Sequence, residues 1–449
     1  MNKTIKIARP PSPKTRSLVG HIPQIRKNPF KFLTECAQEY GDIVYLRFGF
    51  KPVYLLCHPN YVEEVLNSKS SYFIKGRSLR SNRMLLGEGL LTSEGDFWKR
   101  QRHLAQPAFD HQQIATYGQI MVDRTNQMLA TWQTGEVREI QQEMLELTLS
   151  IVAKTLFDAD ILSEAKEVGI AMQAVMNHFN RRVMSTVVFP PYIPTIANLS
   201  YRRAIQRIDT IIDNFISQRR ASSKNFGDLL SLLLKAQGED SSDRMSDRQL
   251  RDEVMTLFVA GHETTARALA WLWLLLSQHP HVEAKLHAEL DRVLNGRVPT
   301  ISDLPQLYYT TMVIQEALRL YPPVWRIERE AIADCEIGGY AVKAGTTILI
   351  SQWLSHRDAR FYDRPNDFIP ERWENNLVDR LPKGTYFPFG MGKRTCIGNR
   401  YAPMKTALII ATIAQKFCLS LVPGHPIEVL PTAVIHSKKG MKMQVRHRL

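Results

Sequence analysis

The sequence predicts a mainly α-helical protein with small β regions, folded as a single large unit. Apolar residues recur at helical spacing over most of residues 60–278. Within that range, residues 249–277 have the length and the periodicity of one long helix. Strand-like alternation is confined to short segments around residues 43–56 and 334–342. The expected fold class is therefore mainly α, with the strands grouped in small separate regions.

The chain gives no sign of a domain boundary. It contains 449 residues, a length that by itself would suggest about three domains. However, no Gly/Ser-rich linker, internal repeat or block of like charge interrupts it. We therefore expect one domain over residues 1–449, in which residues 1–25 form an extended, Pro-rich arm.

Local signals place several elements along the chain. The alternating residues 43–48 and 53–56 predict a β-hairpin. A helix expected over residues 304–320 should end before a Pro-Pro pair, because proline disfavours helical backbone in the residue that precedes it. Further on, Gly338-Gly339 suits the positive φ angles of a tight turn between two short strands.

The composition is that of an ordinary globular protein, with 44% hydrophobic and 23% charged residues. Lys and Arg outnumber Asp and Glu by 58 to 44, which gives a formal net charge of +14. Such an excess suggests a nucleic acid, an acidic membrane or an acidic protein as partner. No helix-turn-helix, zinc-finger or RNP signature accompanies the charge, so we do not expect nucleic-acid binding.

No segment of the sequence suggests insertion into a membrane. The basic N-terminus lacks the apolar stretch of a signal peptide. The uncharged run of residues 183–201 contains three prolines, and the apolar run of residues 268–276 is far shorter than the ~20 residues of a membrane helix. The five cysteines form no CxxC pair, which fits a reducing compartment. We expect a cytoplasmic protein without a transmembrane anchor.

The most informative segment, residues 387–398, is a Gly-rich loop that carries one cysteine toward a helix expected from Gly398 to about Phe417. Its glycines permit sharp turns and a close approach of another group to the backbone. The positive end of the helix and the nearby Arg394 both favour the thiolate form of Cys396. Backbone N–H groups that donate to this sulfur would tune the potential of a metal–thiolate bond.

The pattern Phe389-x-x-Gly392-x-Arg394-x-Cys396-x-Gly398 resembles the cysteine loop of the cytochrome P450 family at every position. The resemblance extends over most of the chain and implies a single large cytochrome P450-like fold that encloses haem b. It also implies that Cys396 is the thiolate ligand of the haem iron, and that Phe389, Arg394 and Gly398 belong to the haem-binding loop. A thiolate ligand donates electron density that favours cleavage of the O–O bond.

A second similarity to the family lies in Glu316-x-x-Arg319. Residues three apart share a helix face, and such a pair is usually a solvated ion pair of little energetic weight. The segment Pro370-Glu371-Arg372-Trp373 supplies a further arginine. The resemblance implies that Arg372 joins Glu316 and Arg319 in a buried network. We expect this network to hold the cysteine loop in place without taking part in the chemistry.

A third similarity is the segment of residues 260–265 inside the long helix. An acid beside an alcohol is costly in an apolar helix unless the two serve a function, and Thr264 can donate back to the carbonyl of Ala260. Gly261 lets a ligand come close. The resemblance implies that this turn forms the dioxygen groove, that Glu263 relays protons and that Thr264 stabilises the reduced oxygen species. We interpret His262 as a packing residue and not as an iron ligand.

Haem carries two propionates, whose burial requires cations. Trp98 and Arg102 lie four apart on one helical face and resemble the family's propionate contacts. Arg394 and Arg329 are further candidates, because related sequences provide a cation at each place. For Arg326 a propionate contact and a surface role are both open.

One departure from the family follows the cysteine loop. Many relatives have Ala-x-x-Glu there, whereas this chain has Ala402-Pro403-Met404-Lys405. We expect Lys405 to alter the surface that a redox partner contacts. The basic residues beside the two segments expected near the cysteine are Lys99, Arg100, Lys393, Arg400 and Lys405.

The expected reaction is insertion of one oxygen atom of dioxygen into a C–H bond of an apolar small molecule, such as a fatty acid, an alkane or a terpenoid. The chain has no Gly-x-Gly-x-x-Gly motif for a flavin or a nicotinamide. Electrons should therefore come from a separate acidic protein, a ferredoxin or a flavodoxin, with its reductase. The charge of +14 is best explained by such a partner.

Several segments should line an apolar substrate cavity, as the resemblance implies. Their large apolar side chains could equally belong to the ordinary core. The residues concerned are Phe73, Met84, Leu85, Leu86, Phe189 and Trp325.

Two alternative functions for a haem-thiolate protein remain open. One is a peroxygenase or a peroxide-rearranging isomerase, and the other is a haem sensor without enzymatic activity. The presence of Glu263 and Thr264 favours the monooxygenase, because neither alternative needs a proton relay for dioxygen.

Overall fold

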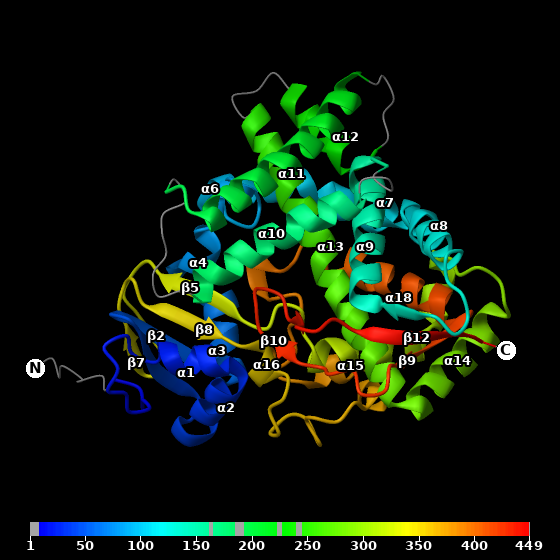
Figure 1. Ribbon diagram of the computed structural model, residues 1–449. Helices are drawn as coiled ribbons and strands as arrows, with labels where there is room; N and C mark the ends of the chain where they lie inside the picture. Colours follow the sequence, from blue (N-terminus) through cyan, green and yellow to red (C-terminus); the bar gives the residue numbers. More distant parts are fainter. Residues whose placement is uncertain (1–8, 161–164, 185–192, 222–226, 239–244, 449) are drawn as a thin grey trace, which may run out of the picture. The chain divides into compact units, whose positions relative to one another are not determined.

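The computed structural model describes residues 9–160, 165–184, 193–221, 227–238 and 245–448 (Figure 1). These residues form two compact units, between which the chain passes several times. The first unit comprises Met1–Ser81, Leu318–Asp367 and Trp373–Cys396. The second comprises Asn82–Ala317, Phe368–Arg372 and Ile397–Leu449.

The first unit is built on a five-stranded sheet in the order β1-β2-β8-β5-β3. The strands are β1 (Ile43–Phe48), β2 (Lys51–Leu56), β3 (Phe73–Lys75), β5 (Ile327–Ala331) and β8 (Thr347–Ile350). The expected hairpin of β1 and β2 is confirmed, and β8 runs parallel to β2. β5 is antiparallel to both β8 and β3. Leu56, Phe73, Ile348 and Ile350 belong to the core that this sheet buries.

The second hairpin of this unit is also confirmed. It consists of β6 (Cys335–Ile337) and β7 (Tyr340–Val342), which pair antiparallel. Its turn residues Gly338 and Gly339 have φ angles of 55° and 83°. A Cβ atom on Gly338 would lie 2.6 Å from Cδ1 of Ile43, so a larger residue does not fit there.

Short helices complete the first unit. They are α1 (Ile22–Lys27), α2 (Pro29–Tyr40), α3 (Pro59–Glu63), α4 (Arg77–Arg80), α16 (Gln352–Ser355) and α17 (Leu377–Arg380), with the helical turns η1 (Glu64–Ser68), η2 (Ser70–Tyr72) and η6 (Gly392–Arg394). The N-terminal arm ends earlier than expected, because α1 begins at Ile22 with Pro23 in its first turn. Residues 1–8 of the arm lie outside the described residues.

The second unit is mainly helical. Its longest helix, α13 (Asp247–Gln278), includes the expected range 249–277. Ser246 and Gln249 cap its start, each side chain bonding to the backbone of the other. The other helices are α5 (Arg83–Leu86), α6 (Gly95–Ala105), α7 (His111–Thr116), α8 (Gly118–Leu129), α9 (Ile140–Phe157), α10 (Ala165–Met184), α11 (Ile196–Ala221), α12 (Leu229–Gly238), α14 (Pro280–Leu294), α15 (Tyr308–Leu320, whose last turn belongs to the first unit) and α18 (Tyr401–Ala414). α13 packs along α9 and also touches α11, α14 and α18.

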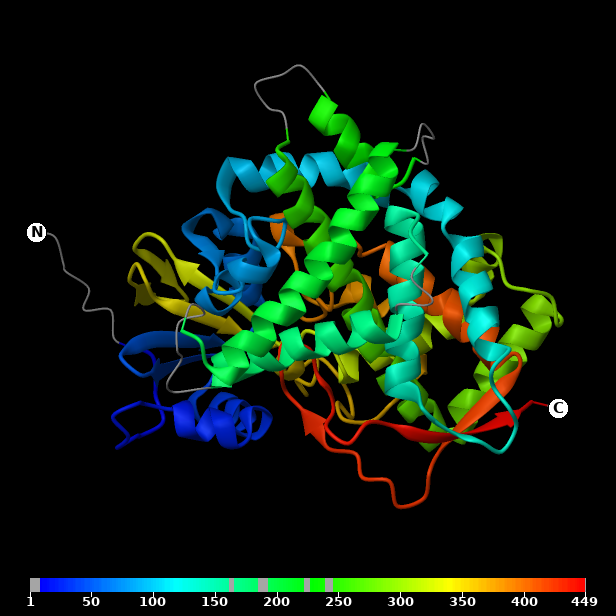
Figure 2. The same cartoon turned by 45° about the horizontal axis from the view of Figure 1, so that its top comes forward.

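Short strands and helical turns complete the second unit. Among the described residues, β4 (Val137–Glu139) and β9 (Phe417–Leu421) flank β12 (Lys442–His447), which is red in Figure 2. β10 (Val429–Leu430) pairs with β11 (His436–Ser437). The 3₁₀ turns are η3 (Gln106–Phe109), η4 (Ile301–Gln306) and η5 (Pro370–Trp373).

Two helices begin later than the sequence predicts. α15 begins at Tyr308 and not at residue 304, because a 3₁₀ turn that contains Pro305 precedes it. α18 begins at Tyr401 and not at Gly398, because residues 397–400 form a turn. It ends at Ala414, shortly before β9.

Within the part of the chain that the structure describes, no helix combines the length and the apolar character that a bilayer crossing requires.

Candidate functional site

Cys396 ends a tight loop in the first unit. Its N–H donates to the carbonyl oxygen of Phe389 at 2.8 Å. Gly390 and Gly392 have φ angles of 72° and 69°, a region that most side chains disfavour. A Cβ atom on Gly392 would also lie 2.1 Å from the carbonyl oxygen of Leu66. The loop therefore needs glycine for its turns and for its close approach to a neighbouring backbone.

The residue Cys396 is exposed, whereas the other four cysteines are buried or half-buried. Burial raises the pKa of Cys36 to about 12 and also raises that of Cys57. These two thiols are therefore protonated packing residues. Cys396 is the one cysteine of the five that is exposed.

Two further candidates of the first unit are arginines. Arg329 lies on β5, is only 8% exposed, and donates from Nη1 to the carbonyl oxygen of Glu328 at 3.0 Å. Arg394 lies in η6 and is half-buried. Arg326 packs its guanidinium over the ring of Trp325, 4.9 Å from the centroid, and forms an ion pair with Glu328 at 3.3 Å.

The second unit holds a buried ion pair between Glu316 and Arg372. Glu316 is fully buried and accepts from Nε of Arg372 at 2.8 Å. The same carboxylate accepts from the N–H of Ile369 at 3.0 Å. Glu316 thus fastens the segment around Arg372 to α15.

Arg319, one turn further along α15, forms hydrogen bonds within the first unit. It is fully buried, and its guanidinium donates to the carbonyl oxygens of His356, Pro365 and Asp367 at 2.6–3.0 Å. His356 in turn accepts from the N–H of Phe387, near the start of the cysteine loop, at 3.0 Å. Burial lowers the pKa of His356 to about 3, so its ring stays neutral and can accept this bond.

In the middle of α13, three successive backbone carbonyl oxygens accept hydrogen bonds from side chains. The hydroxyl of Thr264 donates to the carbonyl oxygen of Ala260 at 3.0 Å, which confirms the bond expected from the sequence. The next two carbonyls, of Gly261 and His262, accept from Nζ of Lys405 at 2.8 Å and from the hydroxyl of Thr148 at 3.0 Å. Ala260, Gly261 and Thr264 are half-buried, whereas most other residues of this turn are buried.

Glu263 and His262 lie on the buried sides of the same turn. Glu263 is 8% exposed and accepts from Nη2 of Arg267 at 3.4 Å. Burial raises the pKa of Glu263, and the charge of Arg267 opposes that shift. His262 contacts the carbonyl oxygen of Phe258 at 3.1 Å, and burial lowers the pKa of its ring to about 4. His262 is therefore a neutral packing residue, as expected.

Trp98 and Arg102 lie on α6, four residues apart. Trp98 is 9% exposed, and Arg102 is half-buried and donates from Nε to Oε1 of Gln106 at 3.1 Å. Gly398 lies in the turn that precedes α18. These residues belong to the second unit, as do those of α13, whereas Arg329, Phe389, Arg394 and Cys396 belong to the first.

The expectation that Lys405 shapes a surface is wrong. The whole residue is buried, and its Nζ bonds to Gly261 inside the second unit. The reason is that α18 is buried along nearly its whole length, including every residue from Lys405 to Ala414, so position 405 has no solvent-facing side. The other basic residues noted near the cysteine are accessible: Lys99, Lys393 and Arg400 are exposed and Arg100 is half-buried.

Comparison with known proteins decides the family. The model of the family described as Cytochrome P450 matches residues 10–445. The chain belongs to the cytochrome P450 family.

Several named relatives match nearly the whole chain. The "Cyclooctat-9-en-7-ol 5-monooxygenase" of Streptomyces melanosporofaciens is 39% identical over 92% of this chain and 90% of its own length. The "Cyclooctatin synthase" of the same organism is 37% identical over the same shares. The "Pentalenene oxygenase" of Streptomyces avermitilis is 31% identical over 97% of both chains. The chain is accordingly an oxidoreductase of the P450 monooxygenase type, a family that binds haem through a cysteine thiolate.

The residues of both units fit such a haem. The first unit offers an exposed cysteine with Arg329 and Arg394, which is the donor set for an iron–thiolate bond and for propionates. The second offers the small residues Ala260 and Gly261 on the half-buried face of α13.

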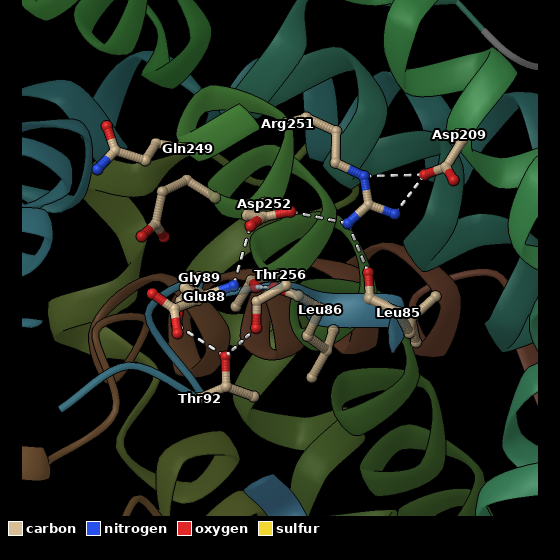
Figure 3. Close-up of polar contacts among 12 residues, drawn as sticks. Leu85, Leu86, Glu88, Gly89, Thr92, Asp209, Gln249, Arg251, Asp252 and Thr256 are labelled. Atoms are coloured by element: carbon tan, nitrogen blue, oxygen red, sulfur yellow. Dashed lines mark hydrogen bonds and ion pairs between the residues drawn. The ribbon is translucent and has the colours of Figure 1, made fainter. Parts of the chain in front are cut away.

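Residues 85–92 are hydrogen-bonded to the first turns of α13, a contact that we call the seat of this loop (Figure 3). The sequence did not predict it. Nη1 of Arg251 donates to the carbonyl oxygen of Leu85 at 2.7 Å, and its Nε donates to Asp209 of α11 at 2.9 Å. Oδ2 of Asp252 accepts from the N–H of Glu88 at 2.9 Å. Arg251 thus joins this loop, α11 and α13.

Two glycines let the loop approach α13. A Cβ atom on Gly87 would lie 1.9 Å from Cγ of Asp252, and one on Gly89 would lie 2.1 Å from Oγ1 of Thr256. Glu253 accepts from the N–H of Leu90 at 3.0 Å, and burial raises its pKa to about 8. The charged run at residues 251–253, at the head of an apolar helix, was the signal that could have revealed this seat.

The residues proposed to line the cavity differ in their burial and in the unit to which they belong. Phe73 packs in the core of the first unit, and Trp325 packs edge-on against Phe30 with ring centroids 5.2 Å apart. Leu85 and Leu86 are buried in the second unit, whereas Met84 is 40% exposed. Phe189 lies outside the described residues.

Among the described residues, one cluster has the chemistry of metal ligands. Ligand atoms of Glu283, His287 and Cys418 lie within 4.8 Å of one another on α14 and β9. None of the three belongs to the motifs of the haem site. Arg446 and Arg448 act on the charge of Glu283, and this positive field disfavours a cation at the cluster.

Substitution Glu316→Gln tests the buried ion pair. It leaves Arg372 buried without its carboxylate, so we expect the free energy of unfolding to fall by about 3 kcal/mol. Urea denaturation followed by far-UV circular dichroism measures the change. As a control, Glu428→Gln removes an exposed pair with Lys438 and should cost less than about 0.5 kcal/mol. Equal losses in the two variants would contradict the role of Glu316.

Proposed function

We propose that this P450 inserts one oxygen atom of dioxygen into a C–H bond of an apolar, terpenoid-like small molecule. The observation that carries the proposal is the exposed Cys396 at the end of a loop that matches the family's cysteine loop at every position. The relatives named for cyclooctatin, cyclooctat-9-en-7-ol and pentalenene favour a terpenoid over a fatty acid or an alkane.

In this proposal the thiolate of Cys396 ligates the iron of haem b. The cations Arg102, Arg329 and Arg394, with the indole N–H of Trp98, neutralise and bind the propionates. Haem supplies the activation of dioxygen with two electrons. Glu316, Arg319 and Arg372 keep the segments before the cysteine loop in place, through bonds that involve no ligand.

Thr264 and Glu263 handle protons in this proposal. The hydroxyl of Thr264, fixed to Ala260, has lone pairs with which to accept a bond at the half-buried face of α13. Glu263 is buried, and burial raises its pKa, which favours the protonated form from which it can donate a proton. The ion pair with Arg267 orients the carboxyl group of Glu263. The apolar residues around this turn exclude bulk water.

The wider assignments belong to the same proposal. The two units act together as one cytochrome P450 domain over residues 1–449, in the cytoplasm. An acidic ferredoxin or flavodoxin, reduced by its own reductase, supplies the electrons. The exposed Lys99, Lys393 and Arg400 support a partner of that charge.

The carbon monoxide difference spectrum of the reduced protein tests the central assignment. We expect the red-shifted band of a thiolate-ligated haem, and we expect Cys396→Ala to abolish it because no other thiolate replaces the ligand. Cys335→Ala is the control and should keep the band. A band that survives in Cys396→Ala would refute the assignment of the ligand.

Substitution Thr264→Ala tests the proton-handling role, with cyclooctat-9-en-7-ol, which appears in the name of one relative, as probe. We expect reductant consumption to continue while product per reductant falls by about tenfold, the low end of what a positioned acid–base group contributes, with peroxide released instead. Thr210→Ala is a matched control, because Thr210 makes the same bond to the carbonyl four residues earlier on an exposed helix face. Tight coupling in Thr264→Ala would contradict the role.

Neutralisation of three exposed cations tests the redox partner. In Lys99→Gln/Lys393→Gln/Arg400→Gln we expect reduction by an acidic [2Fe–2S] ferredoxin to slow by about tenfold at low ionic strength, with a shallower salt dependence. Stopped-flow absorbance of the haem measures the rate.

The control neutralises exposed cations elsewhere, in Lys51→Gln/Arg292→Gln/Lys442→Gln. Its net charge changes by the same amount. If both triple variants slow equally, net charge alone is responsible, and the proposal that Lys99, Lys393 and Arg400 bind the redox partner is wrong.

A further inference from the structure

Lys405 is a lysine buried without a carboxylate. It is 0% exposed, and no carboxylate of the described residues forms an ion pair with it. An unpaired ammonium in such a place is costly, and burial lowers the pKa of Lys405 to about 7. A side chain kept in an unfavourable environment needs a compensating interaction.

That interaction is with the backbone of α13. Nζ of Lys405 donates to the carbonyl oxygen of Gly261 at 2.8 Å. It also lies over the ring of Tyr401, 4.9 Å from the centroid. The hydroxyl of Tyr401 is in turn bonded to Thr155 of α9 at 2.7 Å. Lys405 therefore reaches from α18 across to α13, beside α9.

Gly261 lies in the contact between α13 and α9. A Cβ atom on Gly261 would lie 3.2 Å from Cγ2 of Val152 on α9. The two flanking carbonyls are also bonded by side chains, Ala260 by Thr264 and His262 by Thr148. Three successive carbonyls thus receive side-chain donors, a pattern that tilts carbonyls away from the helix axis.

We propose that Lys405 is a positioning residue of the oxygen-activating turn: by holding the carbonyl of Gly261, it fixes the backbone from Ala260 to Thr264 and so the direction of the Thr264 hydroxyl. This inference rests on the proposed function, which assigns that turn to dioxygen. Lysine suits the task because it is a donor in both protonation states, whereas a carboxylate cannot donate to a carbonyl. The lysine thus does directly what the acid common in relatives could do only with a bound proton or water.

The burial of Lys405 has its own test. Between pH 7 and its ordinary pKa of 10.5, the unfolded chain binds a proton that the folded protein does not, so stability rises with pH. Among the described residues, the titratable groups beside it include His262, which burial keeps neutral, and the phenol of Tyr401, whose pKa burial raises. From about pH 7 to about pH 9, the melting temperature of the wild type should therefore rise relative to that of Lys405→Met.

The decisive experiment compares the haem-loaded wild type with Lys405→Met and with Lys416→Met. Lys416 lies just after α18 and bonds to Asn126 at an exposed site, so its variant is the control. The carbon monoxide spectrum is recorded first, and a wild type without the thiolate band would refute the proposed function itself. Each reduced protein is then mixed with dissolved dioxygen, and its return to the oxidised state and the peroxide released are followed by stopped-flow absorbance and a peroxide assay.

We expect Lys405→Met to keep the thiolate band but to return to the oxidised state about tenfold faster, with more peroxide, because the turn is no longer fixed. Lys416→Met should match the wild type. A rate and a peroxide yield in Lys405→Met within twofold of the wild type would overturn the proposal. If Lys405→Met does not bind haem, Lys405→Leu is tested in the same way, and loss of haem in both variants but not in Lys416→Met would show a purely structural lysine and also overturn it.

Discussion

The structure of the second unit depends on how α13 is held at the turn that contains Gly261. The helix packs along α9 there, and the absence of a side chain on Gly261 allows the approach. Donors from α9 and α18 bind consecutive carbonyls, so the turn is fixed from two sides. These bonds add to the ordinary helix ladder, because each carbonyl oxygen has a second lone pair that can accept a side-chain donor.

Charged groups buried in the second unit lose their hydration, which lowers the stability of the fold unless the charges are paired. Glu316 and Arg372 offset this loss by pairing, and Glu263 does so in part with Arg267. Lys405 has no such partner among the residues that the structure describes, and burial lowers its pKa. Lys405 of α18 and Glu263 of α13, whose pKa values burial shifts, are therefore both found at the turn of α13 to which we assign oxygen chemistry, and perturbed pKa values are common at functional sites.

Local patterns predicted the parts of the fold that depend on neighbours in sequence. The hairpin at Gly338-Gly339, the range of α13 and the bond from Thr264 to Ala260 all follow from residues within a few positions of one another. Lys405 was misplaced because a lone cation in a helix normally marks its solvent face, and only the tertiary structure shows that α18 has none at that position. The contact of Arg251 with Leu85 was missed for a similar reason, since the two are far apart in the chain and the charged run at residues 251–253 does not indicate which segment it binds.

The seat of residues 85–92 on α13 limits how this enzyme could change its substrate. Gly87 and Gly89 have no room for a side chain, and their neighbours Asp252 and Thr256 belong to the same helix as Thr264. A mutation that moved this loop would therefore also disturb the helix to which we assign oxygen activation. Met84, which is 40% exposed and just outside the seat, carries no such constraint. Evolution or laboratory selection for new substrates would be expected to accept changes at Met84 far more readily than at the two glycines.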